Sequence, residues 1–242
     1  MIKLTDRLQL IADLIENGET MADIGTDHGF LPLYLFQSGI SPKVIMCDIS
    51  GPSLDKAREA FEQCGLADDA QFRLGDGLKV LKENEVDTVV IAGMGGLLIT
   101  QILEGDPDKT TSFRKYIFQP RNNSALLRRW LTAKGFEIDK NRIVKEGKFI
   151  CEIITAFAPK TLKMSDFEPS GGLLSEDDPA WDLPADITGA QKGIERDMAL
   201  LKMSQEMNKL EGLRKSRNVD EKEIETAEKR IEYFRRFAND KI

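Results

Sequence analysis

The chain has 242 residues and is acidic, with 41 Asp and Glu against 34 Lys and Arg and a net charge of −7. One histidine and three widely separated cysteines argue against a zinc site and against a catalytic triad that uses several histidines. No apolar run is long enough for a signal segment or a membrane span, and cysteines without an evident partner are typical of the cytoplasm. We therefore expect a cytoplasmic protein with no metal ion and no membrane contact. We take it to be a monomer.

The first predicted element is an amphipathic helix over residues 5–16. Its apolar side chains recur at helical spacing: Leu8, Ile11, Ala12 and Ile15. We expect this helix to pack against the core beneath the functional site, with Arg7 within reach of that site.

A short apolar strand then leads into a turn with two glycines and two acids, in the run MADIGTDHGFLP at residues 21–32. Glycines let the backbone approach a ligand closely, and a dinucleotide-binding turn would have the spacing G-x-G-x-x-G. Here Asp23 precedes the first glycine, and Asp27 stands where the second would be. Two carboxylates would repel a pyrophosphate but suit a cationic ligand such as S-adenosylmethionine, which has a sulfonium and an ammonium group. The alternative is a strand–turn–helix corner with incidental acids.

Two further predicted strands also end near acids. Residues 43–48 form a largely apolar run that stops at Asp48, about twenty residues beyond the glycine turn, where a carboxylate binds the ribose hydroxyls of an adenosine group. Residues 70–74 are followed by Gly75-Asp76-Gly77, and an Asp between glycines is often a simple turn residue. In register with Asp23 and Asp48, Asp76 becomes a candidate acceptor for the adenine amino group.

The fourth predicted strand, residues 87–92, is almost wholly apolar, as expected for a parallel strand buried on both faces. It leads into Gly93-Met94-Gly95-Gly96 and then a helix from near Leu97. The glycines leave bare carbonyl groups and space for a flat ring, with the polarisable side chain of Met94 against its face. The equally weighted alternative is that these glycines only allow the helix to pack closely on the strand.

A fifth predicted strand, residues 115–118, brings Gln119, Pro120 and Arg121 to the same edge. Residues 137–144 and 149–158 predict an antiparallel pair that completes the sheet. Strands alternating with helices indicate an α/β fold: a Rossmann-like, doubly wound domain with a mostly parallel seven-stranded sheet over residues 1–160. Ligands of such sheets bind outside the carboxyl ends of the strands, where these acids and glycines converge.

Residues 161–242 predict a linker and a second, helical domain. The linker, residues 161–190, is rich in acids, glycines and prolines, and Trp181 indicates that part of it packs down. Beyond it, two sets of apolar residues recur at three-four spacing: Leu200, Met203, Met207 and Leu210, then Ile224, Ala227, Ile231, Phe234 and Ala238. A break at residues 218–220, with Asp220 and Glu223 as a capping-box-like start, predicts an antiparallel coiled-coil hairpin with these stripes as its seam.

Positive charge gathers in parts of this acidic chain. Residues 110–160 carry a net charge of +7 and residues 196–242 a net charge of +2, whereas residues 1–109 carry −10. Arg121, Arg128 and Arg129 lie in the first basic stretch and would form an RNA-contacting face near the site. A solvated surface is the alternative, and RNA contact would make binding steeply salt-dependent.

The segments MADIGTDHGFLP, CDISGPSLDKA, GDGL, AGMGG and FQPR, in this order, resemble the bacterial tRNA (adenine-22-N1)-methyltransferase family (TrmK-like) over most of residues 1–158. The resemblance implies a class I methyltransferase domain that uses S-adenosylmethionine, a helical coiled-coil domain after it, and methyl transfer to N1 of adenine 22 in tRNA. The expected cofactor-binding residues are Asp23, Gly25, Thr26, His28, Gly29, Asp48, Ile49, Gly75, Asp76, Gly77, Ala92, Gly93 and Met94. The expected substrate-binding residues are Arg7, Gly95, Gly96, Gln119, Pro120, Arg121, Arg128 and Arg129.

Methylation of adenine N1 requires alignment rather than proton removal, because N1 is largely unprotonated at neutral pH and has an in-plane lone pair. A carboxylate or a carbonyl would stabilise the cationic product ring. Asp27 is the first candidate for this catalytic role, together with Gly93 and Met94. The competing role of Asp27 is to bind the ammonium group of the cofactor.

Two other classes of function stay open at this stage. One is a methyltransferase that acts on a small molecule or a protein, for which the basic stretches would be incidental. The other is a non-catalytic RNA-binding protein that has kept the fold. The presence of Asp23, Asp48 and Asp76 together disfavours the second class, since a binding protein has little need of all three.

Overall fold

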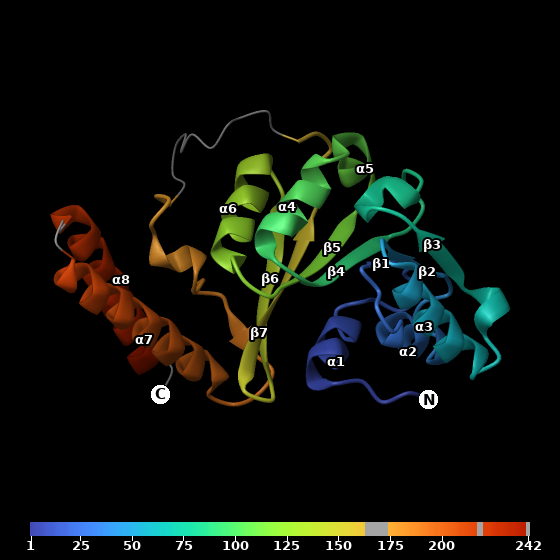
Figure 1. Ribbon diagram of the computed structural model, residues 1–242, viewed down its shortest axis with the longest axis horizontal. Coiled ribbons are helices and arrows are strands. Elements are labelled where there is room, and N and C mark those ends of the chain that lie inside the picture. The colour runs from blue at the N-terminus through green and yellow to red at the C-terminus, as the bar shows by residue number, and fades with distance from the viewer. Residues whose placement is uncertain (163–173, 217–219, 241–242) are drawn as a thin grey trace.

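A computed structural model describes residues 1–162, 174–216 and 220–240, and Figure 1 shows a central sheet with helices on both faces and a helical hairpin beyond one edge. The strands are Met21–Ile24 (β1), Val44–Asp48 (β2), Gln71–Leu74 (β3), Thr88–Met94 (β4), Lys115–Pro120 (β5), Glu137–Glu146 (β6), Phe149–Phe157 (β7) and Thr188–Gly189 (β8). The helices are Asp6–Ala12 (α1), Phe30–Gln37 (α2), Gly51–Glu62 (α3), Gly96–Glu104 (α4), Pro107–Ser112 (α5), Ser124–Lys134 (α6), Ile194–Lys215 (α7) and Glu221–Asp240 (α8). The α/β class is therefore confirmed.

The strands form one sheet in the order β3-β2-β1-β4-β5-β7-β6-β8. Strands β1 to β5 are parallel, and β7 is antiparallel to both β5 and β6. The chain passes to opposite sides of β1, since β1 pairs with β2 on one side and with β4 on the other. A crevice opens at such a switch point at the carboxyl ends of the strands, and the glycine turn after β1 and the end of β4 both lie there.

The prediction of seven strands was wrong by one. Strand β8 comes from the expected linker and pairs in parallel with β6, with Arg142 beside Thr188. The Ala190 amide also donates to the Ile143 carbonyl at 2.8 Å. Burial of Leu183 and Ile187 holds this short segment against the sheet. A two-residue strand has no alternating pattern that a sequence could reveal.

Alternate residues of the central strands pack against different helices. Ala22 and Ile24 face a cluster that contains side chains of α4 and α6, whereas Met21 faces a cluster built with α1, α2 and α3. Both faces are thus buried, which accounts for the nearly continuous apolar sequence of these strands. Helix α1 is shorter than the predicted residues 5–16, and it begins after Thr5, whose side chain accepts a hydrogen bond from the Leu8 amide at 3.4 Å.

The helical hairpin of α7 and α8 is present, but the predicted seam of α7 is partly wrong. Leu200 and Met207 are 38% and 50% exposed, and the buried residues of the helix are Ile194, Met198, Ala199, Glu206 and Leu210. The reason is that α7 contacts β6 and the linker as well as α8, so its buried face is turned away from the predicted stripe. On α8, the buried residues are Ala227, Ile231, Phe234 and Ala238, as predicted.

The predicted break between these helices falls mainly outside the described residues, because residues 217–219 are not among them. Asp220 is described, and its side chain accepts hydrogen bonds from the amides of Lys222, at 2.9 Å, and Glu223, at 3.4 Å. This geometry satisfies two of the free N–H groups at the start of α8 and agrees with the predicted cap.

Candidate active site

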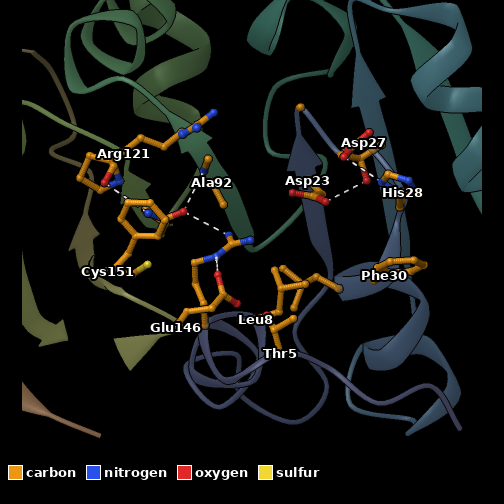
Figure 2. A pocket seen from close by; sticks show the side chains of 18 of the residues that line it. Thr5, Leu8, Asp23, Asp27, His28, Phe30, Ala92, Arg121, Glu146 and Cys151 are labelled. Atoms are coloured by element: carbon orange, nitrogen blue, oxygen red, sulfur yellow. Dashed lines mark hydrogen bonds and ion pairs between the residues drawn. The ribbon is translucent and has the colours of Figure 1, made fainter. Parts of the chain in front are cut away.

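A cavity of about 670 Å³ opens at the carboxyl ends of β1, β4 and β5. Figure 2 shows Asp23, Asp27 and His28 along one side, and Ala92, Arg121 and Cys151 along the other. Helix α1 and the β6–β7 hairpin complete the wall. The predicted site residues that line it are Arg7, Asp23, Gly25, Thr26, Asp27, His28, Ala92, Gly93, Gln119, Pro120 and Arg121.

Asp23 is the buried acid of this cavity, with 6% of its surface exposed. The hydroxyl of Thr26 donates to Asp23 Oδ2 at 2.8 Å. Burial raises the pKa of Asp23 to about 6, the hydrogen bond from Thr26 lowers it, and the nearby charge of Asp48 adds to the rise. A carboxylate held in such surroundings gains strongly from a cationic ligand, because the ligand restores the stabilisation that burial removed.

The rest of the turn presents polar groups to the same cavity. Asp27 has a φ of 47°, a left-handed conformation that turns the chain between two glycines of positive φ. Its carboxylate lies 2.8 Å from Nδ1 of His28, and the ring of His28 stacks on Phe30 with centroids 5.3 Å apart. The side chains of Asp27 and His28 are 62% and 47% exposed. Both groups are therefore accessible from the cavity, and His28 also packs against Phe30.

A hydrogen-bonded chain fixes the opposite wall. The strand β4 bulges at Gly93, since Ala92 pairs with Gln119 and Met94 pairs with Pro120. Oε1 of Gln119 accepts from the Gly93 amide and from Nη1 of Arg7, both at 3.1 Å. Nε of Arg7 in turn donates to Oε2 of Glu146 at 3.0 Å. The expectation that Arg7 reaches the site from the first helix agrees with this geometry.

The glycines after β4 divide into two kinds. A Cβ at Gly93 would meet nothing within 4 Å, so this residue leaves open space, and its φ of 76° favours glycine. A Cβ at Gly96 would lie 2.4 Å from the Asn123 carbonyl oxygen, and one at Gly95 would lie 2.9 Å from Oδ1 of Asn122. The close-packing interpretation thus fits Gly95 and Gly96, and neither lines the cavity. The methyl group of Met94 covers Gly25, since it would be 2.3 Å from a Cβ there.

Several predicted cofactor residues lie outside the main cavity. Asp48 is beside the turn, where its carboxylate accepts from the amides of Ser50, at 2.8 Å, and Asp27, at 3.4 Å. Asp76 and Gly77 line a second cavity of about 230 Å³, and Asp76 pairs with Lys79 at 2.6 Å. The remaining members of the set outside the main cavity are Gly29, Ile49, Gly75 and Met94.

The placement of Arg128 at an RNA-contacting surface was wrong. Arg128 is 1% exposed, and its guanidinium donates to Glu152 at 2.7 Å, to Asn141 at 2.8 Å and to the carbonyl of Trp181 at 3.0 Å. A guanidinium in a low-dielectric interior needs such partners, and here they come from β6, β7 and the linker. Arg129 forms a salt bridge with Glu176 and does not line the cavity either.

Other wall residues were missed by the sequence analysis. They are Thr5, Leu8, Phe30, Leu31, Glu146, Phe149, Ile150 and Cys151. The last four flank the tight turn at Gly147-Lys148, and a glycine between two predicted strands is a signal for a short hairpin. That signal gives the turn, but only the tertiary structure shows that the hairpin lines the same cavity as the ends of β4 and β5.

Within the described ranges, no three His, Cys, Asp or Glu side chains gather in a way that could hold a metal ion. Over those same ranges, no helix combines the length and the apolar character that a membrane span requires.

Comparison with known proteins finds similar sequences and structures. Residues 4–154 match the model of the methyltransferase domain. The tRNA (adenine(22)-N(1))-methyltransferase of Bacillus subtilis (strain 168) is 39% identical over 157 residues, which are 65% of this chain and 66% of that protein, so the match spans just under two thirds of the relative's length.

Two solved structures extend the similarity over nearly the whole chain. The structure of the B. subtilis M1A22 tRNA methyltransferase TrmK has a TM-score of 0.78 at 25% identity, covering 98% of this chain and 100% of the other. That of M. capricolum TrmK, in complex with S-adenosyl-homocysteine, has a TM-score of 0.74 at 25% identity, covering 98% of each. With a cavity at the switch point of the sheet and a family match over more than half of its length, the chain belongs to the methyltransferase domain family.

Proposed function

We propose that this protein is a tRNA methyltransferase that transfers a methyl group from S-adenosylmethionine to N1 of adenine 22 in bacterial tRNA. The observation that carries the proposal is the cavity in which a buried and an exposed carboxylate face the glycine bulge of β4. The similarity to the B. subtilis enzyme supports the choice of tRNA and of the atom. The absence of a membrane-spanning helix among the described residues is compatible with a cytoplasmic location beside tRNA.

Residues of the cavity, and two acids that lie outside it, fit the proposed cofactor. The buried carboxylate of Asp23 and the accessible carboxylate of Asp27 supply negative charge for an ammonium and a sulfonium. The open space at Gly93 allows a group of the ligand to lie close to the backbone. Asp48 is the last residue of β2, two residues beyond Met46, which pairs with Asp23, and it would accept hydrogen bonds from ribose hydroxyls. Asp76 would accept a hydrogen bond from the amino group of the cofactor's adenine.

When bound, S-adenosylmethionine supplies an electrophilic methyl group: the bond from sulfur to the methyl carbon breaks, a bond from adenine N1 to that carbon forms, and the positive charge moves to the adenine ring. No proton moves in this exchange, so the protein does not need a general base. Its task is to hold N1 in line with the methyl group and to stabilise the new charge.

Two features of the cavity suit these tasks. The series of hydrogen bonds from Glu146 through Arg7 and Gln119 to the Gly93 amide fixes the bulge of β4. The carbonyl groups of Ala92 and Gly93 would then accept hydrogen bonds from the amino group of the target adenine. Asp27 supplies a carboxylate for the cationic product ring. Its salt bridge to Lys56, at 3.9 Å, is long enough that the charge of Asp27 remains available. Met94 covers Gly25 from outside the cavity, so its proposed contact with the ligand requires its side chain to move.

We further propose that residues 1–160 form the cofactor-binding unit and residues 161–242 a second unit that helps to hold tRNA. The side chains of α7 and α8 contribute to two apolar clusters: the first also contains Ile143 of β6 and two linker residues, and the second contains no residue of the sheet. Arg121 is the basic side chain at the cavity mouth, where it would contact the phosphate backbone near the target base. A base that is stacked or paired would have to turn out of the tRNA to reach the cavity.

The test is transfer of a labelled methyl group to total unmodified bacterial tRNA, followed by nucleoside analysis. We expect 1-methyladenosine from the wild-type protein, and its loss in Asp27→Ala and Asp48→Ala. Asp68→Ala is the matched control, because Asp68 is an exposed acid that lines neither cavity. Label that appears only in protein or in small molecules would refute the proposal.

A further inference from the structure

Two exposed phenylalanines line the cavity, Phe30 and Phe149, and the ring of Phe30 already stacks on His28. Phe149 is 64% exposed and lines the cavity wall. It stands at the first residue of β7, directly after the turn of the β6–β7 hairpin. Single exposed apolar residues are common on protein surfaces. An exposed ring at the mouth of a ligand cavity is different, because it offers a flat apolar face where a ligand enters.

The backbone beneath this ring is held rigidly. Glu146 and Phe149 are paired in the hairpin register, and Gly147 between them has a φ of 60°, as a tight two-residue turn requires. Glu146 is held by Arg7 of α1, and Arg7 also bonds Gln119 at the end of β5. The hairpin end is therefore tied to two other elements of the cavity. Ordering a ligand against Phe149 costs little conformational entropy of the backbone.

The ring also has an electrostatic preference. Nζ of Lys148 lies 5.3 Å from its centroid, so a cation already approaches the ring. Across the cavity, the acceptors of the β4 bulge and the carboxylate of Asp27 would bind the edge of a base, and they offer no flat apolar surface. A flat base needs a stacking surface as well as partners for its edge.

We infer that Phe149 is the stacking surface for the target adenine and that it specifies an aromatic base in the cavity; this inference rests on the proposed function. The ring contacts the face of the adenine while the carbonyl groups of Ala92 and Gly93 accept from its edge. Methylation makes the adenine ring cationic, and an aromatic face attracts a cation more strongly than a neutral ring. Phe149 therefore stabilises the transition state beyond its contribution to substrate binding.

The test compares Phe149→Ala, Phe149→Leu and Phe149→Tyr with the wild type in single-turnover methylation of an unmodified tRNA transcript, at saturating and at limiting tRNA. Phe149→Leu is the matched control, because leucine keeps apolar bulk without a ring. We expect Phe149→Ala and Phe149→Leu to lower the rate at saturating tRNA roughly ten-fold or more, as for loss of a base–aromatic stack. Phe149→Tyr should restore the rate to within about two-fold of the wild type, because tyrosine keeps the π-face.

Binding of S-adenosylhomocysteine, measured by calorimetry on the same variants, separates the outcomes. Equal affinity of all four proteins for S-adenosylhomocysteine supports contact of Phe149 with the target base and not with the cofactor. Wild-type rates in Phe149→Ala, or full restoration by Phe149→Leu, would overturn the inference while the proposed function stands. Loss of S-adenosylhomocysteine binding in Phe149→Ala would assign the ring to the cofactor and overturn it as well. A wild-type protein that binds S-adenosylhomocysteine yet methylates no tRNA would overturn the proposed function together with the inference.

Discussion

Replacing Arg128 by methionine is the most informative perturbation of the fold, because this residue of α6 binds β6, β7 and the linker at one buried point. Its guanidinium is buried and pairs with Glu152, and Glu152 also lies 3.6 Å from Lys202 of α7. Arg128→Met leaves the Glu152 carboxylate with less compensation in a low-dielectric interior. Removing one partner of a buried ion pair lowers the free energy of unfolding by about 3–5 kcal/mol. For a chain of this size, each kcal/mol lowers the melting temperature by about 2–4 °C, so we expect a fall of roughly 6–20 °C.

The assay is thermal unfolding followed by circular dichroism at pH 7, with Arg129→Met as the matched control. Arg129 is the next residue of α6, and its partner Glu176 has a side chain that is 66% exposed, so this control should lose at most about 1 kcal/mol. The double variant Arg128→Met/Glu152→Met should lose less than the sum of the single changes, because it removes both charges. A melting temperature of Arg128→Met within about 2 °C of the wild type, together with weaker and less salt-dependent tRNA binding, would refute this reasoning.

The pH dependence of the same pair has a definite sign. Burial alone would raise the pKa of Glu152, but the charges of Arg128 and Lys202 outweigh it and hold the pKa below its ordinary value. The pair therefore contributes stability above the unfolded-state pKa of about 4.3, and this contribution falls as the pH drops through the lower folded-state pKa. In Arg128→Met this contribution is absent, so the free energy of unfolding should fall less steeply than in the wild type as the pH drops below about 4.3.

Two further predictions concern the cavity, and a third concerns the start of α4. Burial raises the pKa of Asp23 to about 6, so ionisation of this carboxyl group lowers the stability of the ligand-free protein as the pH rises from 3.8 through about 6. Asparagine does not ionise, and Asp23→Asn should therefore raise the melting temperature at pH 7. The same variant should lose stabilisation by S-adenosylmethionine, and a thermal shift unchanged from the wild type would contradict the role of Asp23. Gln119→Leu removes the acceptor that Arg7 and Gly93 share, so kcat should fall roughly ten- to a hundred-fold with tRNA affinity nearly unchanged; a change in affinity alone would argue against positioning. Gly96→Ala should cost about 1–3 kcal/mol in chemical unfolding, because its Cβ meets a backbone oxygen, and an unchanged midpoint would show that α4 adjusts freely.

Much of the site could be predicted because parallel strands impose a simple rule. Their residues are apolar on both faces, and their carboxyl ends meet at one edge, so Asp23, Asp48 and Gly93 could be placed together from local patterns. The glycines at positions 25 and 93 adopt positive φ, which a sequence signals directly.

The remainder depends on contacts between distant parts of the chain. Arg128 looks like a solvated helix residue until β7, 24 residues later, supplies Glu152. Helix α7 has apolar residues on more than one side, and only its packing on β6 decides that Met198 is buried while Leu200 is not. Phe149 follows a recognisable turn, but its place at the cavity is set by the tie from Glu146 to Arg7. Periodicity describes a single element, whereas each of these features belongs to two or three.

Methyl transfer to N1 of adenine 22 can be tested by locating the methyl group in a defined RNA. An unmodified tRNA transcript with adenine at position 22 would be incubated with the protein and labelled S-adenosylmethionine beside a transcript that carries guanine there. Mass spectrometry of the digested RNA would then give the modified position. Transfer to N1 of adenine 22 predicts 1-methyladenosine at position 22 of the first transcript and no methylation of the second. Equal labelling of both transcripts, or a methyl group at another position, would contradict it.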